Sequence, residues 1–256
     1  MTSVSIVIPA RDEAETVADV VRCARAGVPT ADVVVVDDGS SDDTEAAAHD
    51  AGARVIPSLG SGKGAALWTG VRETHGEVVL FLDGDVTNPR AETAAALVDA
   101  LTADTSLMMV RAAYERPYGS RPGEGGRVTE LTARPALTLL FPSLAHLRQP
   151  LAGEVATRRS AIESVAFVDG YGVDVGLLLD IAARYGADAI GEVSIASRAH
   201  RNRPLHQLTP MAVEVLRVIL HRAGVATVGP PPHERPPLTT ERSFLSRDDL
   251  SREGLT

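Results

Sequence analysis

The sequence predicts an α/β protein with a mostly parallel, doubly wound sheet. Short apolar segments alternate with helical segments four times between Val4 and Ala103, which is the pattern of consecutive strand–helix units. The strand segments are apolar at consecutive positions, as expected of strands that are covered by helices on both faces. With 256 residues, of which 44% are hydrophobic and 23% charged, the chain is large enough to bury one extensive core.

The first half contains four strand–helix units. Its predicted strands are short and rich in β-branched residues, and we expect Gly52 and Gly76 to stop the second and third helices. The strands are VSIVIPA (4–10), DVVVVDDG (32–39), ARVIPS (53–58) and EVVLFLDGD (77–85). The helices are EAETVADVVRCARAG (13–27), DDTEAAAHDAG (42–52), GAALWTGVRETHG (64–76) and ETAAALVDALTA (92–103).

The second half alternates less regularly. A strand over 106–117 precedes the glycine-rich stretch YGSRPGEGG, for which we predict a loop, and a helix over 127–141 is interrupted near Pro135. The later elements are a loop, strand and helix within 149–165, a helix over 173–187, a strand over 188–200 and a helix over 211–224. The proline-rich end of the chain predicts a flexible tail over 227–256.

Composition excludes several classes of function. The net charge of −9 argues against non-specific binding of nucleic acid. The single cysteine, Cys23, cannot form an internal disulfide, which indicates a reducing compartment. No apolar run approaches the roughly 18 residues of a membrane span, and the N-terminus lacks the pattern of a signal peptide. We therefore expect a cytoplasmic protein without a membrane anchor.

Polar and glycine-rich residues follow each of the first four predicted strands. The sequences PARDEA, DDGSSD, PSLGSGKG and DGDVTNP lie at these strand ends. In an open parallel sheet, ligands bind at the carboxyl ends of the strands. Solvated turns explain one such strand end, but four ends with this chemistry on one edge predict a binding site there.

The glycine cluster GSGKGA does not match the common phosphate-binding motifs in context. It fails as a Walker loop, because Pro57 stands where the first glycine belongs and Gly64 replaces the magnesium-binding serine or threonine. A dinucleotide fingerprint, with Gly60, Gly62 and Ala65, matches in form but follows the third strand instead of the first. Lys63 in this setting can approach a diphosphate or a carboxylate.

Two acids at the end of the fourth strand predict a divalent cation. Asp83 and Asp85 would repel each other if both were buried, and Mg²⁺ binds one or two carboxylates together with water and phosphate oxygens. In the second half, His200 stands among Arg198, Arg201 and Arg203, which predicts contact with a metal or with a phosphate. Such a local cationic cluster suits an anionic substrate.

Taken in order, these motifs resemble those of a known enzyme family. PARDEA, DDGSSDDT, GKGAALW and DGD resemble the nucleotide-sugar glycosyltransferases of GT-A fold. GGRVTELTARP, QPLAGE, GYGVDVGLLLD and HRNRPL narrow the resemblance to the glucosyl-3-phosphoglycerate synthases of actinobacteria. The resemblance extends from about Ser3 to Gly224. It implies a nucleotide-sugar-binding half (1–114) and an acceptor-binding, metal-completing half (115–226) of one domain.

The resemblance assigns roles to residues of this chain. It implies donor binding by Pro9, Ala10, Arg11, Glu13, Asp38, Lys63, Asp83, Gly84, Asp85, Tyr171 and Asp174, and acceptor binding by Gly126, Arg127, Val128, Thr129 and Asn202. Asp85 and His200 would hold the metal. Asp85, Leu151 and Asp174 would be the catalytic residues, with the Leu151 backbone beside the transferred sugar and Tyr171 and Asp174 at its hydroxyls.

The implied activity is transfer of glucose from UDP-glucose to 3-phosphoglycerate with retention of configuration. It would require Mg²⁺ or Mn²⁺, and the family suggests a homodimer. Three positions depart from the family pattern: Gly84 replaces a serine, Asp174 a glutamate, and Glu115 a basic residue. The loop before Gly126 is also short. These departures leave open another nucleotide sugar or another small phosphorylated acceptor.

Two other classes of function remain open on the sequence. A nucleotidyltransferase also combines a parallel sheet with paired acids around magnesium, but its glycine-rich loop should follow the first strand, where IPARDEA has no glycine. A non-catalytic binder of nucleotide sugars is the other class. The presence of Asp83, Asp85, Lys63 and His200 argues against it.

Overall fold

A computed structural model describes residues 2–116, 126–199 and 204–240. It contains a seven-stranded sheet in the order β3-β2-β1-β4-β6-β5-β8. The strands are β1 (Val4–Ala10), β2 (Asp32–Asp37), β3 (Arg54–Pro57), β4 (Val78–Phe81), β5 (Met109–Ala113), β6 (Val155–Arg158) and β8 (Ile190–Ser194). All neighbours pair in parallel except β6, which runs antiparallel to both β4 and β5. The predicted mostly parallel sheet is confirmed.

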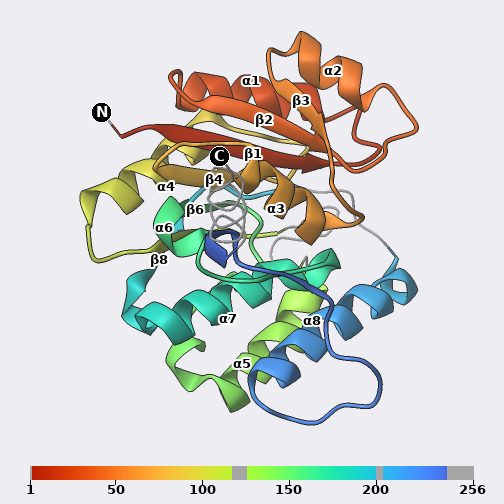
Figure 1. The fold of residues 1–256 in the computed structure, drawn as a ribbon, viewed down its shortest axis with the longest axis vertical. Helices are drawn as coiled ribbons and strands as arrows, with labels where there is room; N and C mark the ends of the chain where they lie inside the picture. Colours follow the sequence, from red (N-terminus) through yellow and green to blue (C-terminus); the bar gives the residue numbers. More distant parts are fainter. Residues whose placement is uncertain (1, 117–125, 200–203, 241–256) are drawn as a thin grey trace, which may run out of the picture.

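Helices cover both faces of this sheet (Figure 1). In β2, Val33 and Val35 belong to a core shared with α1, α2 and α4, whereas Val34 and Val36 belong to a core shared with α3, α7 and α8. This alternation follows the pleat of a strand, whose successive side chains point to opposite faces. The helices are α1 (Val17–Gly27), α2 (Thr44–Asp50), α3 (Lys63–Arg72), α4 (Ala91–Ala103), α5 (Arg134–Leu140), α6 (Arg159–Ile162), α7 (Val173–Tyr185) and α8 (Thr209–Arg222).

Several elements are shorter than the sequence predicts. The predicted strand over 77–85 ends at Phe81, which leaves Asp83 and Asp85 in the following loop. The predicted helix over 127–141 consists of a π-helical turn, η1 (Thr129–Ala133), followed directly by α5. Pro135 lies in the first turn of α5, where its missing N–H breaks the regular bonding pattern. The interruption predicted near Pro135 is therefore a change from a π-helical turn to an α-helix.

The prediction of a flexible tail over 227–256 is wrong for residues 233–240. There, β9 (Glu234–Arg235) pairs antiparallel with β7 (Phe167–Val168). Leu238 is only 2% exposed, and the indole Nε1 of Trp68 donates a hydrogen bond to the carbonyl of Pro236 (3.1 Å). The composition of this segment is polar, but one buried leucine and its backbone contacts anchor it. Residues 241–256 lie outside the described part of the chain.

The described helices include none with the length and apolar character needed to cross a membrane.

Replacing Leu238 with alanine should destabilise the protein. Because Leu238 is buried, the change removes apolar contacts and leaves a cavity, and we expect the free energy of unfolding to fall by about 2–3 kcal/mol. Urea unfolding measures this difference. Val228→Ala is the matched control. Val228 lies in the same predicted tail and is 98% exposed, so its substitution should change the free energy of unfolding by less than about 0.5 kcal/mol. Equal effects of the two substitutions would mean that the segment does not pack.

Candidate functional site

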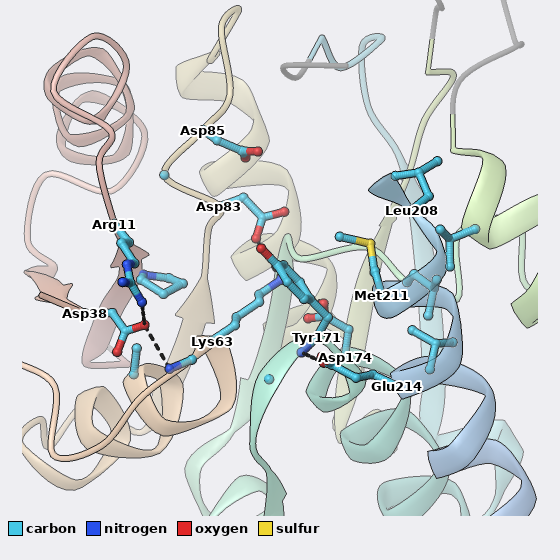
Figure 2. Close-up of a pocket in the computed structure, with 18 of the residues that line it drawn as sticks. Arg11, Asp38, Lys63, Asp83, Asp85, Tyr171, Asp174, Leu208, Met211 and Glu214 are labelled. Carbon is cyan, nitrogen blue, oxygen red and sulfur yellow. Dashed lines mark hydrogen bonds and ion pairs between the residues drawn. The ribbon is translucent and has the colours of Figure 1, made fainter. Parts of the chain in front are cut away.

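A cavity of about 760 Å³ opens at the carboxyl edge of the parallel strands. Loops after β1, β2 and β4 form one side of it, and η1, α7 and α8 form the other (Figure 2). It is lined by every described residue to which the family resemblance assigns a role: Pro9, Ala10, Arg11, Glu13, Asp38, Lys63, Asp83, Gly84, Asp85, Gly126, Arg127, Val128, Thr129, Leu151, Tyr171 and Asp174. Arg198, which the sequence groups with His200, does not line it, because its guanidinium is buried against Glu154 (3.1 Å). His200 and Asn202 lie outside the described residues.

Asp38 connects two of the loops at the mouth of this cavity. Its Oδ2 accepts a hydrogen bond from the backbone N–H of Gly62 (2.8 Å), which immediately precedes α3. The same oxygen lies 3.8 Å from a guanidinium nitrogen of Arg11, whose side chain is 59% exposed. Asp38 thus fixes the glycine-rich loop while Arg11 extends into solvent. Because Arg11 is exposed and the contact is long, this pair contributes little to stability, and Arg11 can exchange it for a ligand.

Lys63 pairs with two carboxylates that are far apart in the sequence. Its Nζ lies 2.8 Å from Oδ1 of Asp83 and 2.8 Å from Oδ2 of Asp174 (Figure 2). All three side chains are largely buried. The lysine begins α3, Asp83 follows β4, and Asp174 lies in the first turn of α7. One ammonium group therefore joins three elements at the floor of the cavity.

Burial and charge act in opposite directions on these groups. Burial alone would lower the pKa of the Lys63 ammonium, but the carboxylates of Asp174 and Asp83 outweigh burial and raise it. Burial raises the pKa of Asp174, and the ammonium of Lys63 opposes that rise. Lys63 consequently stays protonated, and it favours the ionised form of Asp174 more strongly than Arg111, which acts in the same direction.

The loop that carries Asp83 and Asp85 packs tightly against its neighbours, and two glycines make this packing possible. A Cβ added to Gly153 would lie 2.2 Å from both carboxylate oxygens of Asp83, so only glycine leaves room for that carboxylate. Gly84 stands where the family has serine, and a Cβ there would lie 2.9 Å from the carbonyl oxygen of Pro9. The hydroxyl of Thr16 donates to the Gly84 carbonyl at 2.8 Å. The loop is therefore held against β1 and α1.

Asp85 offers the acid suited to a divalent cation. The Asp83 carboxylate already contacts Lys63, whereas Asp85 lies farther along the loop and lines the cavity (Figure 2). A carboxylate at a cavity wall is a hard oxygen ligand of the kind that Mg²⁺ and Mn²⁺ bind. The described residues contain no cluster of three metal-ligating side chains, so other ligands would have to come from His200, water or substrate.

Cations gather at the end of the cavity formed by η1. Arg127 and Thr129 line it, and η1 is a π-helical turn, a form that is frequent at functional sites. Gly126 has a left-handed backbone (φ 68°) just before η1. Arg116 also lines the cavity, and sequence reasoning missed it. The stretch AAYERP could have indicated Arg116, because this cation follows directly on the unusual Glu115.

Helix α8 supplies a wall that the sequence did not predict. Leu208 precedes the helix, and Met211, Glu214 and Val215 lie on it and line the cavity. Glu214 accepts a hydrogen bond from the backbone N–H of Tyr171 through Oε2 (2.8 Å). No sequence motif marks these positions, because they approach the site only through the packing of α8 on the turn that carries Tyr171.

The chain is similar in sequence to proteins of known activity. Residues 5–149 match glycosyl transferase family 2. The glucosyl-3-phosphoglycerate synthase of Mycolicibacterium paratuberculosis is 39% identical over 244 residues, which cover 89% of this chain and 74% of that relative. The protein of the same name from Mycolicibacterium smegmatis is 39% identical over 241 residues, 89% of this chain and 80% of the relative.

Solved structures show the same similarity. One is a crystal structure of glucosyl-3-phosphoglycerate synthase from Mycobacterium tuberculosis in complex with Mn²⁺, UDP-glucose and phosphoglyceric acid. It has a TM-score of 0.87 at 37% identity and covers 94% of this chain and 92% of that one. Another, with Mg²⁺ and UDP, has a TM-score of 0.86 at 36% identity and the same coverage. The predicted GT-A fold is confirmed.

Removing the charge of Lys63 should raise the pKa of Asp174. Because an opposite charge close to a carboxyl group lowers its pKa, we expect the pKa of Asp174 to be higher in Lys63→Met than in the wild type. NMR titration of the carboxyl carbons of labelled aspartate measures it.

Arg54→Met is the control for this titration. It removes an exposed cation from β3, where Arg54 pairs with Asp32, and should leave Asp174 unchanged. If Asp174 titrated at one pH in all three proteins, Lys63 would not be its counter-ion.

Proposed function

The chain belongs to glycosyl transferase family 2 and, within it, to the glucosyl-3-phosphoglycerate synthases, and from this membership we propose that it transfers glucose from UDP-glucose to 3-phosphoglycerate. The observation that supports this most is the convergence of two sets of motifs on one cavity. Strand ends of the first half bring most of the residues assigned to the donor, and the segment 126–129, which leads into η1, brings the described residues assigned to the acceptor. Membership in a glycosyltransferase family also removes the nucleotidyltransferase alternative.

The donor would lie along the edge of the parallel strands. Arg11 and Asp38 stand at the mouth, where they suit a nucleoside, and Lys63 lies deeper, between Asp83 and Asp174. The ammonium of Lys63 can attract a diphosphate without leaving the two carboxylates, because it has three donors. Tyr171 and Asp174 beyond it would bind hydroxyls of the transferred sugar.

Asp85 and His200 are the residues that would hold a divalent cation. Crystal structures of the Mycobacterium tuberculosis relative contain Mn²⁺ or Mg²⁺ together with UDP-glucose or UDP. When bound, such a cation would stabilise negative charge on the departing diphosphate. Asp83 would act indirectly, since its contact with Lys63 fixes the loop that presents Asp85.

The acceptor would be bound at the η1 end of the cavity. The guanidinium of Arg127 matches a phosphate or carboxylate with two parallel hydrogen bonds, and Arg116 adds a second cation to the same wall. Gly126, Val128 and Thr129 would complete this subsite with backbone and hydroxyl groups, together with Asn202. Binding here would bring the acceptor hydroxyl close to the sugar held near Leu151.

The residues of this chain would then promote transfer mainly by position. When the acceptor hydroxyl and the sugar are held in one cavity, their reaction becomes effectively unimolecular, and less entropy is lost in reaching the transition state. Leu151 and Asp174 both line this cavity. Asp174, kept ionised by Lys63, would orient the sugar, while retention of configuration follows from family membership. In this account Asp85, Leu151 and Asp174 are the catalytic residues.

We further infer a homodimer that works in the cytoplasm. Large apolar side chains are exposed at Leu131 and Leu139, in η1 and α5, and at Val213 and Leu216 in α8. Exposed apolar surface of this kind supports an interface between subunits. Analytical ultracentrifugation would measure the subunit number directly.

The direct test of the proposed function is a reaction with purified protein. UDP-glucose, 3-phosphoglycerate and Mg²⁺ should yield UDP and a glucosylated phosphoglycerate, which mass spectrometry identifies. Reactions with other UDP-sugars or other phosphorylated acceptors in parallel test the substrate choice. Faster turnover of a different pair would replace the proposed substrates, and UDP-glucose binding without turnover with any acceptor would favour a non-catalytic binder.

Activity should depend on Asp85 and on a divalent cation. Asp85→Ala removes the carboxylate assigned to the metal, and we expect turnover to fall at least about tenfold while the protein stays folded. A chelator should abolish the activity of the wild type, and added Mg²⁺ should restore it. Asp50→Ala is the control, because Asp50 is an exposed aspartate of α2. Full activity of Asp85→Ala, or of the wild type in chelator, would exclude this role.

Loss of Arg127 should weaken binding of the acceptor much more than binding of the donor. Removing a charge-assisted hydrogen bond costs about 1.5–3 kcal/mol, so in Arg127→Ala we expect the KM for 3-phosphoglycerate to rise by roughly 10- to 100-fold. Steady-state kinetics with each substrate varied in turn measure both KM values. Arg134→Ala serves as control, since Arg134 pairs with Glu130 one turn further along. Equal increases in both KM values would place Arg127 outside the acceptor subsite.

A further inference from the structure

Arg111 is a buried cation below the cavity, and no role assigned so far uses it. It lies in the middle of β5 and is 1% exposed. Within residues 2–116, 126–199 and 204–240 it forms no ion pair with a carboxylate. Its guanidinium instead donates to three backbone carbonyls: those of Pro150 (3.0 Å), Ala152 (2.8 Å) and Asp174 (3.3 Å).

These carbonyls belong to the two segments that line the proposed sugar subsite. Pro150 and Ala152 flank Leu151, which lines the cavity in the loop before β6, and Asp174 is in the first turn of α7. The register of the sheet explains the approach, because Arg111 pairs with Val155 of β6, just after that loop. One side chain thus connects β5, the Leu151 loop and the start of α7.

The energetic cost of this arrangement argues for a role beyond stability. Burying a charge without a direct ion pair is costly, although the carboxylates of Asp174, Glu192 and Glu154 lie near enough to favour the charged form of Arg111. An apolar side chain of similar size often stabilises a core at least as well. Burial lowers the pKa of Arg111, although arginine remains charged in proteins. What the guanidinium adds is geometry, since its planar fork fixes the relative positions of its acceptors.

We propose that Arg111 is a positioning residue for sugar transfer, which holds the Leu151 backbone and the Asp174 turn in the arrangement that receives the transferred sugar. This inference rests on the proposed function for the identity of the sugar subsite. Arg111 itself does not line the cavity. It acts through the two segments that it connects.

A second arginine provides a matched control. Arg158, in β6, also donates to three carbonyls: those of Leu107 (2.7 Å), Leu101 (3.0 Å) and Asp104 (3.1 Å). It pairs with Val78, the first residue of β4, and so lies at the edge of the sheet opposite the cavity. Replacing either arginine with lysine keeps the charge and removes the fork. Only the Arg111 substitution should change the sugar subsite.

The test compares Arg111→Lys with Arg158→Lys in the full chain. In Arg111→Lys we expect kcat to fall on the order of tenfold, whereas the affinity for UDP, measured by calorimetry with Mg²⁺, stays within about twofold. Hydrogen–deuterium exchange should increase across residues 149–154. In Arg158→Lys, kcat should stay within about twofold of the wild type even where Tm falls equally.

The following results for the Arg111 variants would overturn the proposal. Unchanged kcat and unchanged exchange in folded Arg111→Lys would show that the fork is not needed, and equal losses of kcat and UDP affinity would indicate general distortion. If the lysine variant does not fold, Arg111→Gln keeps an amide donor without the charge, and failure of both variants to fold would make Arg111 structural. An inactive wild type would refute the proposed function instead, and the exchange measurement would still decide the role of Arg111.

Discussion

The ion pairs of Lys63 with Asp83 and Asp174 are the constraint on which the site depends. They join the first residue of α3 to the loop after β4 and to the first turn of α7, so each half of the chain is fixed relative to the other at this point. Two carboxylates this close would repel each other without a cation between them. Gly153 makes this contact possible, because its lack of a side chain leaves space for the Asp83 carboxylate.

The same ion pairs explain why the two acids at the end of β4 differ. Their spacing alone does not distinguish Asp83 from Asp85, and we expected a metal to relieve their repulsion; only the family resemblance assigned that metal to Asp85. In the structure Asp83 pairs with Lys63, whereas Asp85 lines the cavity farther along the loop. Asp83 thus has an internal cation beside it, and Asp85 is the acid for which we propose a divalent ion.

The sequence was sufficient to predict those site residues whose positions follow from the order of strands and helices. Parallel strands bring their carboxyl ends to one edge, so Asp38, Lys63 and Asp85 could be placed together before any contact was known. Contacts between remote segments could not be predicted in this way. Glu214 reaches Tyr171 through the packing of α8, and Leu238 is a single apolar residue in a polar segment. Arg111 did leave a signal, since a charge within the apolar run LMMVRAAY is unusual for a buried strand.

Charge distribution links the fold to the choice of substrates. The chain carries a net charge of −9, yet both proposed substrates are anions. Within the cavity, Arg11, Lys63, Arg116 and Arg127 face the acids Asp38, Asp83, Asp85 and Asp174. Arg11 and Lys63 each contact carboxylates of Asp38, Asp83 or Asp174, and these carboxylates offset part of the positive charge that the first half offers to a diphosphate. A cation bound at Asp85 would compensate for this, whereas the acceptor would rely on Arg116 and Arg127. The proposed metal would therefore add positive charge on the side of the cavity where most of the acids lie.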